Sequence, residues 1–206
     1  MSIRAIVFDF GNVLGYFSHR KAAEQLSRFA PPGTTPEQIS AVLHGGEIEA
    51  RFETNEIGAD HVFALMRERL RLDGSDDALA HAYADMFTPN EHTCRLVPQL
   101  QGSYRLILLS NTNELHFRHF RRQFADVLDR FDALVTSHEV GVRKPDPRIF
   151  AHAQRLAGAH AHECLFIDDL AENVEAAWGC GWRGVVYRRD DDVRARLAEV
   201  GVRFPS

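Results

Sequence analysis

The chain has 206 residues, of which 45% are hydrophobic and 26% are charged, so it has enough apolar material to form a hydrophobic core. Its length suits one domain, or one domain that carries a smaller insertion. The net charge of −5 argues against a broad nucleic-acid-binding surface and no apolar run approaches the length of a membrane span, so we expect neither a nucleic acid nor a membrane as a partner.

Short apolar runs mark the predicted strands. The first covers residues 4–8, ends at Asp9 and is too short for a signal peptide. Helices are expected next over residues 18–29, 36–44, 60–70 and 76–87, with Ser18 and Asp60 as N-caps. Four more apolar runs follow, over residues 105–109, 133–136, 164–167 and 184–187. Between and after them we expect helices over residues 113–124, 147–157 and 173–180, then a charged surface helix and tail over residues 188–206.

The apolar runs predict a parallel sheet, because each has the continuous apolar character of a strand that is buried on both faces. Their alternation with helices predicts a doubly wound α/β fold. The long helical segment between the first two strands predicts a helical cap inserted over an active site. We therefore expect a catalytic core of residues 1–15 and 91–206, and a cap of residues 16–90.

Polar residues stand at the ends of the predicted strands. Asp9 follows the first strand, Ser110 and Asn111 follow the second, and Asp168 and Asp169 follow the fourth. In open α/β sheets, ligands bind beyond the carboxyl ends of the strands, so these side chains should converge at one edge. Lys144, one of only two lysines among 24 basic residues, lies in the loop after the third strand and should join them.

Converging carboxylates favour a bound cation, because like charges at close range repel strongly. Oxygen ligands suit Mg²⁺, which shares its coordination shell with waters and a substrate phosphate. A carboxylate beside that metal can attack phosphorus as a nucleophile, and Ser110 and Lys144 would hold the phosphoryl oxygens. The sequence therefore predicts a magnesium-dependent phosphatase that forms an aspartyl-phosphate on Asp9 and acts on a small phosphorylated metabolite.

The same segments resemble the four motifs of the haloacid dehalogenase-like hydrolases, in order and across nearly the whole chain. These segments are Asp9–Val13, Ser110–Thr112, Lys144–Pro145, and Asp168–Asp169 with Asn173. The likeness is strongest to bacterial sugar-phosphate phosphatases such as alpha-D-glucose-1-phosphate phosphatase, which implies a sugar phosphate as substrate.

This resemblance implies a Rossmann-like core with a helical cap, and it assigns roles to individual residues. Asp9 would be the nucleophile. Asp9, the Gly11 carbonyl and Asp169 would bind the metal, with Asp168 as a close second carboxylate. Ser110 and Lys144 would be phosphate clamps, and Asn111 would bind substrate beside them.

Gly11 departs from the pattern of most phosphatases in this family, which have a second Asp at that position as general acid and base. Loss of a positioned acid typically costs about 10²–10⁴ in rate. Without a donor, the leaving oxygen departs with more negative charge, so Gly11 predicts a bias towards sugar 1-phosphates, acyl phosphates and aryl phosphates. A proton from water, or from a cap residue such as His19, would flatten that bias.

Two other functions remain open. A 2-haloacid dehalogenase shares the Asp nucleophile and needs no metal, but the pair Asp168 and Asp169 makes sense only with a cation. A binding or regulatory homologue with weakened catalysis is the second alternative, although it would have no reason to keep the four motifs. Substrate choice should depend on the cap, where the unranked candidates are Phe17, His19, Arg20, Glu47 and Arg51.

Cysteine usage indicates a reducing compartment. The three cysteines, Cys94, Cys164 and Cys180, are odd in number and widely spaced, so they show neither a disulfide framework nor metal-site spacing. We therefore expect a cytoplasmic protein. No sequence feature specifies its oligomeric state.

Overall fold

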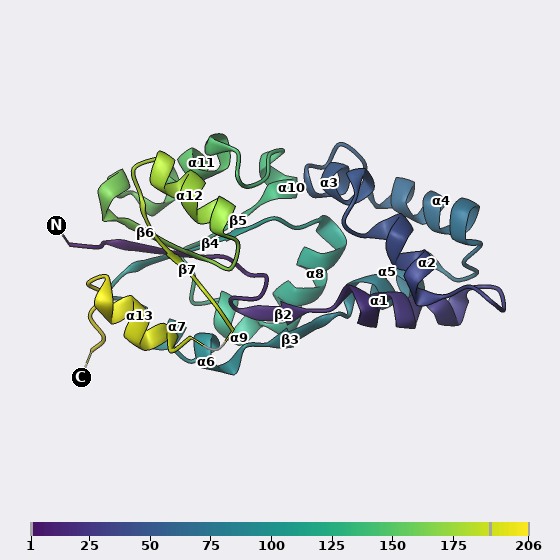
Figure 1. Ribbon diagram of the computed structural model, residues 1–206, viewed down its shortest axis with the longest axis horizontal. Helices are drawn as coiled ribbons and strands as arrows, with labels where there is room; N and C mark the ends of the chain where they lie inside the picture. The colour runs from purple at the N-terminus through teal and green to yellow at the C-terminus, as the bar shows by residue number, and fades with distance from the viewer. Residues whose placement is uncertain (1, 190, 206) are drawn as a thin grey trace.

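The computed structural model describes residues 2–189 and 191–205 and is built on a five-stranded parallel sheet (Figure 1). Its strand order is β5-β4-β1-β6-β7. The strands are β1 (Ala5–Phe8), β4 (Arg105–Ser110), β5 (Ala133–Thr136), β6 (Cys164–Asp168) and β7 (Arg183–Val186). This order, with the first strand between the second and the fourth of the sheet, is that of a doubly wound Rossmann-like fold and confirms the predicted fold class.

The strands bury both faces, which is why their sequences are continuously apolar. In β1, Ile6 and Phe8 pack into one hydrophobic cluster, whereas Ala5 and Val7 pack into another on the opposite face. Helices α11 (Pro147–Ala157) and α12 (Ala171–Gly179) cover the Ala5 face. The helices α7 (Val97–Leu100), α8 (Glu114–Gln123), α9 (Ala125–Leu128) and α13 (Val193–Glu199) cover the other. The chain also forms two further short helices, α6 (Glu91–Cys94) and α10 (Ser137–Val140), and two 3₁₀ turns, Ser27–Phe29 and Ala161–Glu163.

Five helices form the inserted cap at the end of the molecule remote from both termini (Figure 1). They are α1 (His19–Leu26), α2 (Pro36–Leu43), α3 (Glu47–Glu53), α4 (Ala59–Leu70) and α5 (Asp76–Ala84). The cap has a hydrophobic cluster of its own, with Leu26, Ile39 and Met66 fully buried within it. The boundaries at residues 16 and 90 stay a prediction.

Two short strands, which the apolar runs of the sequence did not predict, connect the core and the cap. Strand β2 (Gly15–Phe17) pairs antiparallel with β3 (Phe87–Pro89), so the chain leaves and rejoins the core side by side. The predicted helix over residues 76–87 ends at Ala84, because Phe87 is taken into this pairing opposite Phe17. Helix α3 was also missed.

The helix ends follow the sequence signals only in part. Ser18 caps α1, as predicted, by accepting a hydrogen bond from the Lys21 N–H. Asp60 is not an N-cap: Gly58 takes that position, and Asp60 lies in the first turn of α4, where the helix dipole favours its charge. In the predicted tail, α13 begins after Asp192, and residues 190 and 206 lie outside the described residues, as does residue 1 of the predicted core. Among the described residues, no helix has both the length and the apolar character needed to cross a bilayer.

Candidate active site

The carboxyl ends of the three central strands place polar side chains together, as the sequence predicts. Asp9 follows β1, and its N–H still donates to the Ile167 carbonyl of β6 at 2.9 Å. Asp168 ends β6 and is fully buried. Lys144 Nζ joins these two strand ends, because it donates to Asp9 Oδ1 at 2.6 Å and to Asp168 Oδ2 at 2.7 Å. Its side chain is only 2% exposed.

Asp168 is held by its neighbours on every side. Asn173 Nδ2 donates to both of its oxygens at 3.1 Å, and the Leu170 N–H donates to Oδ1 at 2.8 Å. With the Lys144 bond, both oxygens therefore have hydrogen-bond partners inside the protein. This arrangement suits a carboxylate that positions Lys144.

Asp169 lies beside the other two carboxylates and is more open. Its Oδ2 accepts a hydrogen bond from Asn12 Nδ2 at 2.9 Å, and Asn12 has the positive φ of 56° that lets the chain turn tightly after Asp9. Asp9, Asp168 and Asp169 each offer an oxygen, and these atoms lie within 4.8 Å of one another. Three carboxylates against one ammonium leave an excess of negative charge, and a hard cation with oxygen ligands fits it.

The electrostatics of the cluster point the same way. Burial is the largest influence on the pKa of Asp9 and raises it to about 8, with Lys144 opposing the shift and Asp168 adding to it. Burial disfavours the Lys144 ammonium, but Asp9 and Asp168 together raise its pKa above the ordinary value. Lys144 is therefore a fixed positive charge, while Asp9 would gain from a second cation.

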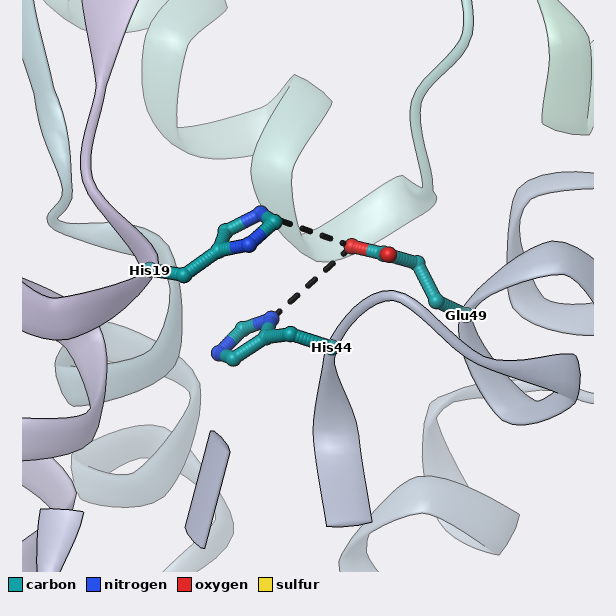
Figure 2. A group of neighbouring side chains, drawn as sticks. All are labelled: His19, His44 and Glu49. Carbon is teal, nitrogen blue, oxygen red and sulfur yellow. Dashed lines mark ion pairs between the residues drawn. The ribbon is translucent and has the colours of Figure 1, made fainter. Parts of the chain in front are cut away.

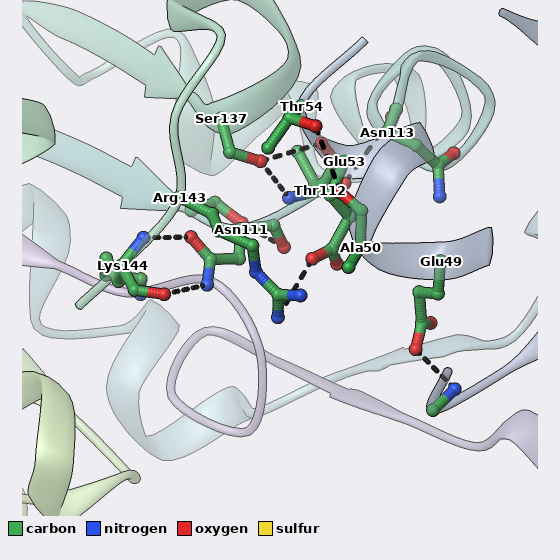
Figure 3. A network of polar contacts seen from close by, with 12 residues as sticks. Glu49, Ala50, Glu53, Thr54, Asn111, Thr112, Asn113, Ser137, Arg143 and Lys144 are labelled. Carbon is green, nitrogen blue, oxygen red and sulfur yellow. Dashed lines mark hydrogen bonds and ion pairs between the residues drawn. The ribbon is translucent and has the colours of Figure 1, made fainter. Parts of the chain in front are cut away.

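Ser110 and Asn111 lie at the end of β4. Ser110 is 2% exposed and lines a small cavity of about 70 Å³ together with Gly11 and His116. The Asn111 side chain bonds the backbone of Lys144 twice, since its Oδ1 accepts from the N–H at 2.7 Å and its Nδ2 donates to the carbonyl at 2.9 Å (Figure 3). Asn111 thus holds the Lys144 loop against β4.

A larger cavity of about 240 Å³ opens onto Asp9, Gly11, Lys144 and Asp169, and the cap forms its opposite wall. Of the cap candidates chosen from the sequence, Phe17 and His19 line it, whereas Arg20, Glu47 and Arg51 do not. Two cap residues that line the cavity were not predicted.

The missed residues are Glu49 and Glu53 of α3. Their spacing of four places both on one face of a helix, and this was the available signal. Glu53 Oε2 lies 3.1 Å from a guanidinium nitrogen of Arg143 (Figure 3). Since Arg143 precedes Lys144 in the sequence, the cap contacts the core beside the Lys144 loop.

Comparison with known proteins agrees with this geometry. A family model described as haloacid dehalogenase-like hydrolase matches residues 3–181. A phosphatase of Mycobacterium tuberculosis is 29% identical over 94% of this chain and 91% of its own length. A D-ribitol-5-phosphate phosphatase of Bacteroides thetaiotaomicron is 25% identical over 96% of this chain and 98% of its own.

Two further similarities differ in what they cover. Drimenol cyclase drtB of Aspergillus calidoustus is 25% identical, but the chain spans only 36% of that protein. A haloacid dehalogenase family enzyme of Bacteroides thetaiotaomicron, solved with magnesium and inorganic phosphate, shares the fold at a TM-score of 0.81. It is 23% identical and matches 95% of this chain and 100% of its own. The motifs, the strand order and the family match together show that the chain belongs to the haloacid dehalogenase-like hydrolases and is an enzyme with phosphatase relatives.

Proposed function

We propose that this enzyme is a magnesium-dependent phosphatase that removes phosphate from a small metabolite through an aspartyl-phosphate on Asp9. The observation that carries the proposal is the environment of Asp9. Its carboxylate is buried, lies 2.6 Å from the Lys144 ammonium and lines a cavity of about 240 Å³. A dehalogenase would not need the extra carboxylates of Asp168 and Asp169.

Magnesium would be held by Asp9, Asp169 and the Gly11 carbonyl. Asp168 is the weaker candidate ligand, because its oxygens already accept bonds from Lys144, Asn173 and the Leu170 N–H. When bound, magnesium would neutralise part of the excess negative charge and polarise the phosphoryl group.

The chain's own residues would perform the transfer in two steps. In the first, an Asp9 carboxylate oxygen bonds to phosphorus while the bond to the leaving oxygen breaks and that oxygen keeps the electron pair. In the second, a water oxygen bonds to phosphorus, the bond to Asp9 breaks, and the carboxylate is restored. Lys144 and Ser110 would hold the phosphoryl oxygens, with Asp168 and Asn111 keeping Lys144 in place.

For the substrate we propose a sugar phosphate or a related polyol phosphate. The cap wall of the cavity presents His19, Glu49 and Glu53, with Arg143 beside them. Such groups donate and accept hydrogen bonds, as a leaving group rich in hydroxyls requires. The relative that acts on D-ribitol 5-phosphate supports this class.

We also propose a cytoplasmic location. The described cysteines Cys94, Cys164 and Cys180 all have free thiols, as expected where thiols stay reduced.

Aryl phosphate hydrolysis with magnesium or excess chelator tests the function. We expect chelator to abolish activity, and Asp169→Ala to remove most activity and to weaken magnesium binding measured by calorimetry. Full activity in chelator would overturn the proposal, and halide release from a 2-haloacid under the same conditions would identify the dehalogenase instead.

A further inference from the structure

The cap carries a cluster of polar rings that the transfer steps above do not use (Figure 2). His19 Nε2 lies 3.6 Å from Glu49 Oε1, and His44 Nδ1 lies 3.8 Å from the same oxygen. The two imidazoles stack with centroids 4.2 Å apart and planes only 6° from parallel. The His44 side chain is 2% exposed, whereas that of His19 is 32% exposed.

The stacking makes this cluster a poor metal site. Its donor atoms lie within 4.8 Å of one another, but an imidazole nitrogen binds a metal along the lone pair in its ring plane. Since the planes are nearly parallel and stacked, one ion cannot lie in both. The chemistry that remains is proton transfer by an imidazole next to a carboxylate.

Glu49 is well suited to orient such an imidazole. Burial acts to raise its pKa, but His44 and the Gly45 N–H lower the pKa of Glu49 to about 2. The Gly45 N–H donates to Glu49 Oε2 at 2.6 Å, which fixes the carboxylate and leaves Oε1 to face the two histidines. Glu49 therefore stays ionised at any pH at which the enzyme would work.

His19 faces the cavity at the point where position 11 lacks an acid. His19 and Gly11 line the same cavity as Asp9. A Cβ at position 11 would lie 3.2 Å from Phe17 Cε1, so the Phe17 ring fills the space next to the glycine. The His19 ring is the next group along, with its centroid 5.1 Å from that of Phe17.

We propose that His19, positioned by Glu49, is the general acid and base that replaces the missing carboxylate at position 11. This inference depends on the proposed phosphatase function. In the first step, protonated His19 gives its proton to the leaving oxygen as the phosphorus–oxygen bond breaks, and the product leaves as a neutral alcohol. In the second step, neutral His19 takes a proton from the attacking water as Asp9 is released, which restores the imidazolium.

The charges around His19 set the expected pH dependence. Burial and His44 lower the pKa of His19 below its ordinary value of 6.5, while Glu49 acts in the opposite direction. The other charged groups that line the same cavity are Glu53, Arg143, Lys144, Asp9 and Asp169. Because the first step needs the imidazolium, turnover of poor leaving groups should fall as pH rises through this pKa.

The test is a leaving-group series measured as kcat/KM for the wild type and His19→Gln. We expect a shallow dependence in the wild type. His19→Gln should lose about 10²–10⁴ with alkyl phosphates, and much less with 4-nitrophenyl phosphate, whose leaving group departs without a proton. With that aryl substrate, the variant should instead show a burst of one product per enzyme, because hydrolysis of the intermediate is slowed.

Three matched variants sharpen the result. His162→Gln removes a surface-exposed histidine of the catalytic core domain and should behave as the wild type. Gly11→Asp in the His19→Gln background should restore alkyl phosphate activity by supplying the acid, with exposed Phe17 moving aside. Glu49→Gln should move the loss of alkyl phosphate activity to lower pH, which a purely structural role would not do.

Equal losses on alkyl and aryl substrates, or no loss on either, would overturn the proposal. Should His19→Gln fail to fold, the wild-type pH profiles decide: alkyl phosphate activity must fall with rising pH where aryl phosphate activity does not. Absence of magnesium-dependent aryl phosphatase activity in the wild type would refute the phosphatase function itself.

Discussion

Lys144→Met tests the central ion cluster, because it removes one charge and little volume. The ammonium contacts two buried carboxylates, Asp9 at 2.6 Å and Asp168 at 2.7 Å, and its side chain is 2% exposed. Loss of one partner from a buried ion pair costs about 3–5 kcal/mol, since it leaves a charge buried and uncompensated.

That free energy should be visible in thermal unfolding. A loss of 1 kcal/mol lowers Tm by about 2–4 °C for a domain of this size, so Lys144→Met should lower Tm by about 6–20 °C. The chain's other lysine provides the control. Lys21 Nζ lies 3.0 Å from Asp85 Oδ1, but its side chain is 43% exposed, so Lys21→Met should cost no more than about 1 kcal/mol.

Calorimetry or circular dichroism of the two variants, with and without magnesium, checks this reasoning. We expect magnesium to raise the Tm of Lys144→Met, because a bound cation reduces the repulsion among the carboxylates that Lys144 no longer neutralises. Aryl phosphatase activity of Lys144→Met should fall by about 10²–10³, as for the loss of one charge-stabilising donor. If the two lysine variants were equally stable, the Lys144 cluster would not hold the strand ends together.

Two further predictions concern Asp9 and Glu53. Asp9→Asn should retain the fold and abolish turnover, and beryllium fluoride should inhibit the wild type by mimicking the aspartyl-phosphate; substantial turnover by pure Asp9→Asn would exclude the nucleophile. Burial raises the pKa of Glu53 from 4.5 to about 7, and Arg143, whose guanidinium lies 3.1 Å from Glu53 Oε2, opposes this shift only in part. Because the pKa is higher in the folded state, the protonated Glu53 favours folding at low pH. This stabilisation is fully present below the unfolded pKa of 4.5 and is lost as pH rises through the folded pKa of about 7. Glu53→Gln should therefore gain up to about 3 kcal/mol relative to the wild type between pH 4.5 and 7 in urea unfolding, and a pH-independent difference would refute it.

The core was predictable because its signals are local. A strand such as Ala5–Phe8 must be apolar at every position when both faces are covered, and the residue that ends it must face the ligand edge. Asp9, Lys144 and Asp168 could therefore be brought together from sequence alone, and the structure joins them within 2.7 Å.

The cap wall was not predictable in the same way. Glu49 and Glu53 lie on a short helix after two glycines and look like solvated charges in the sequence. Only the packing of α3 towards Arg143 turns them inward. Likewise, no sequence pattern shows that the Asn111 side-chain amide forms hydrogen bonds with both the N–H and the carbonyl of Lys144, because that contact joins residues far apart in the chain.

The glycine at position 11 makes the proposed chemistry of the catalytic core depend on the cap. On our proposal, the core has no acid of its own at position 11, so it expels most readily the leaving groups that depart as anions, and efficient cleavage of alkyl phosphates needs the cap. Glu49 and Glu53 belong to one helix, and Glu53 contacts Arg143, the neighbour of Lys144 in sequence. The helix that contacts the core at Arg143 therefore also carries Glu49, whose Oε1 lies 3.6 Å from His19 Nε2 at the cavity. On our proposal, the cap wall that contacts the leaving group also supplies its proton, because His19, Glu49 and Glu53 line the same cavity as Asp9, so substrate choice and proton supply depend on the same residues.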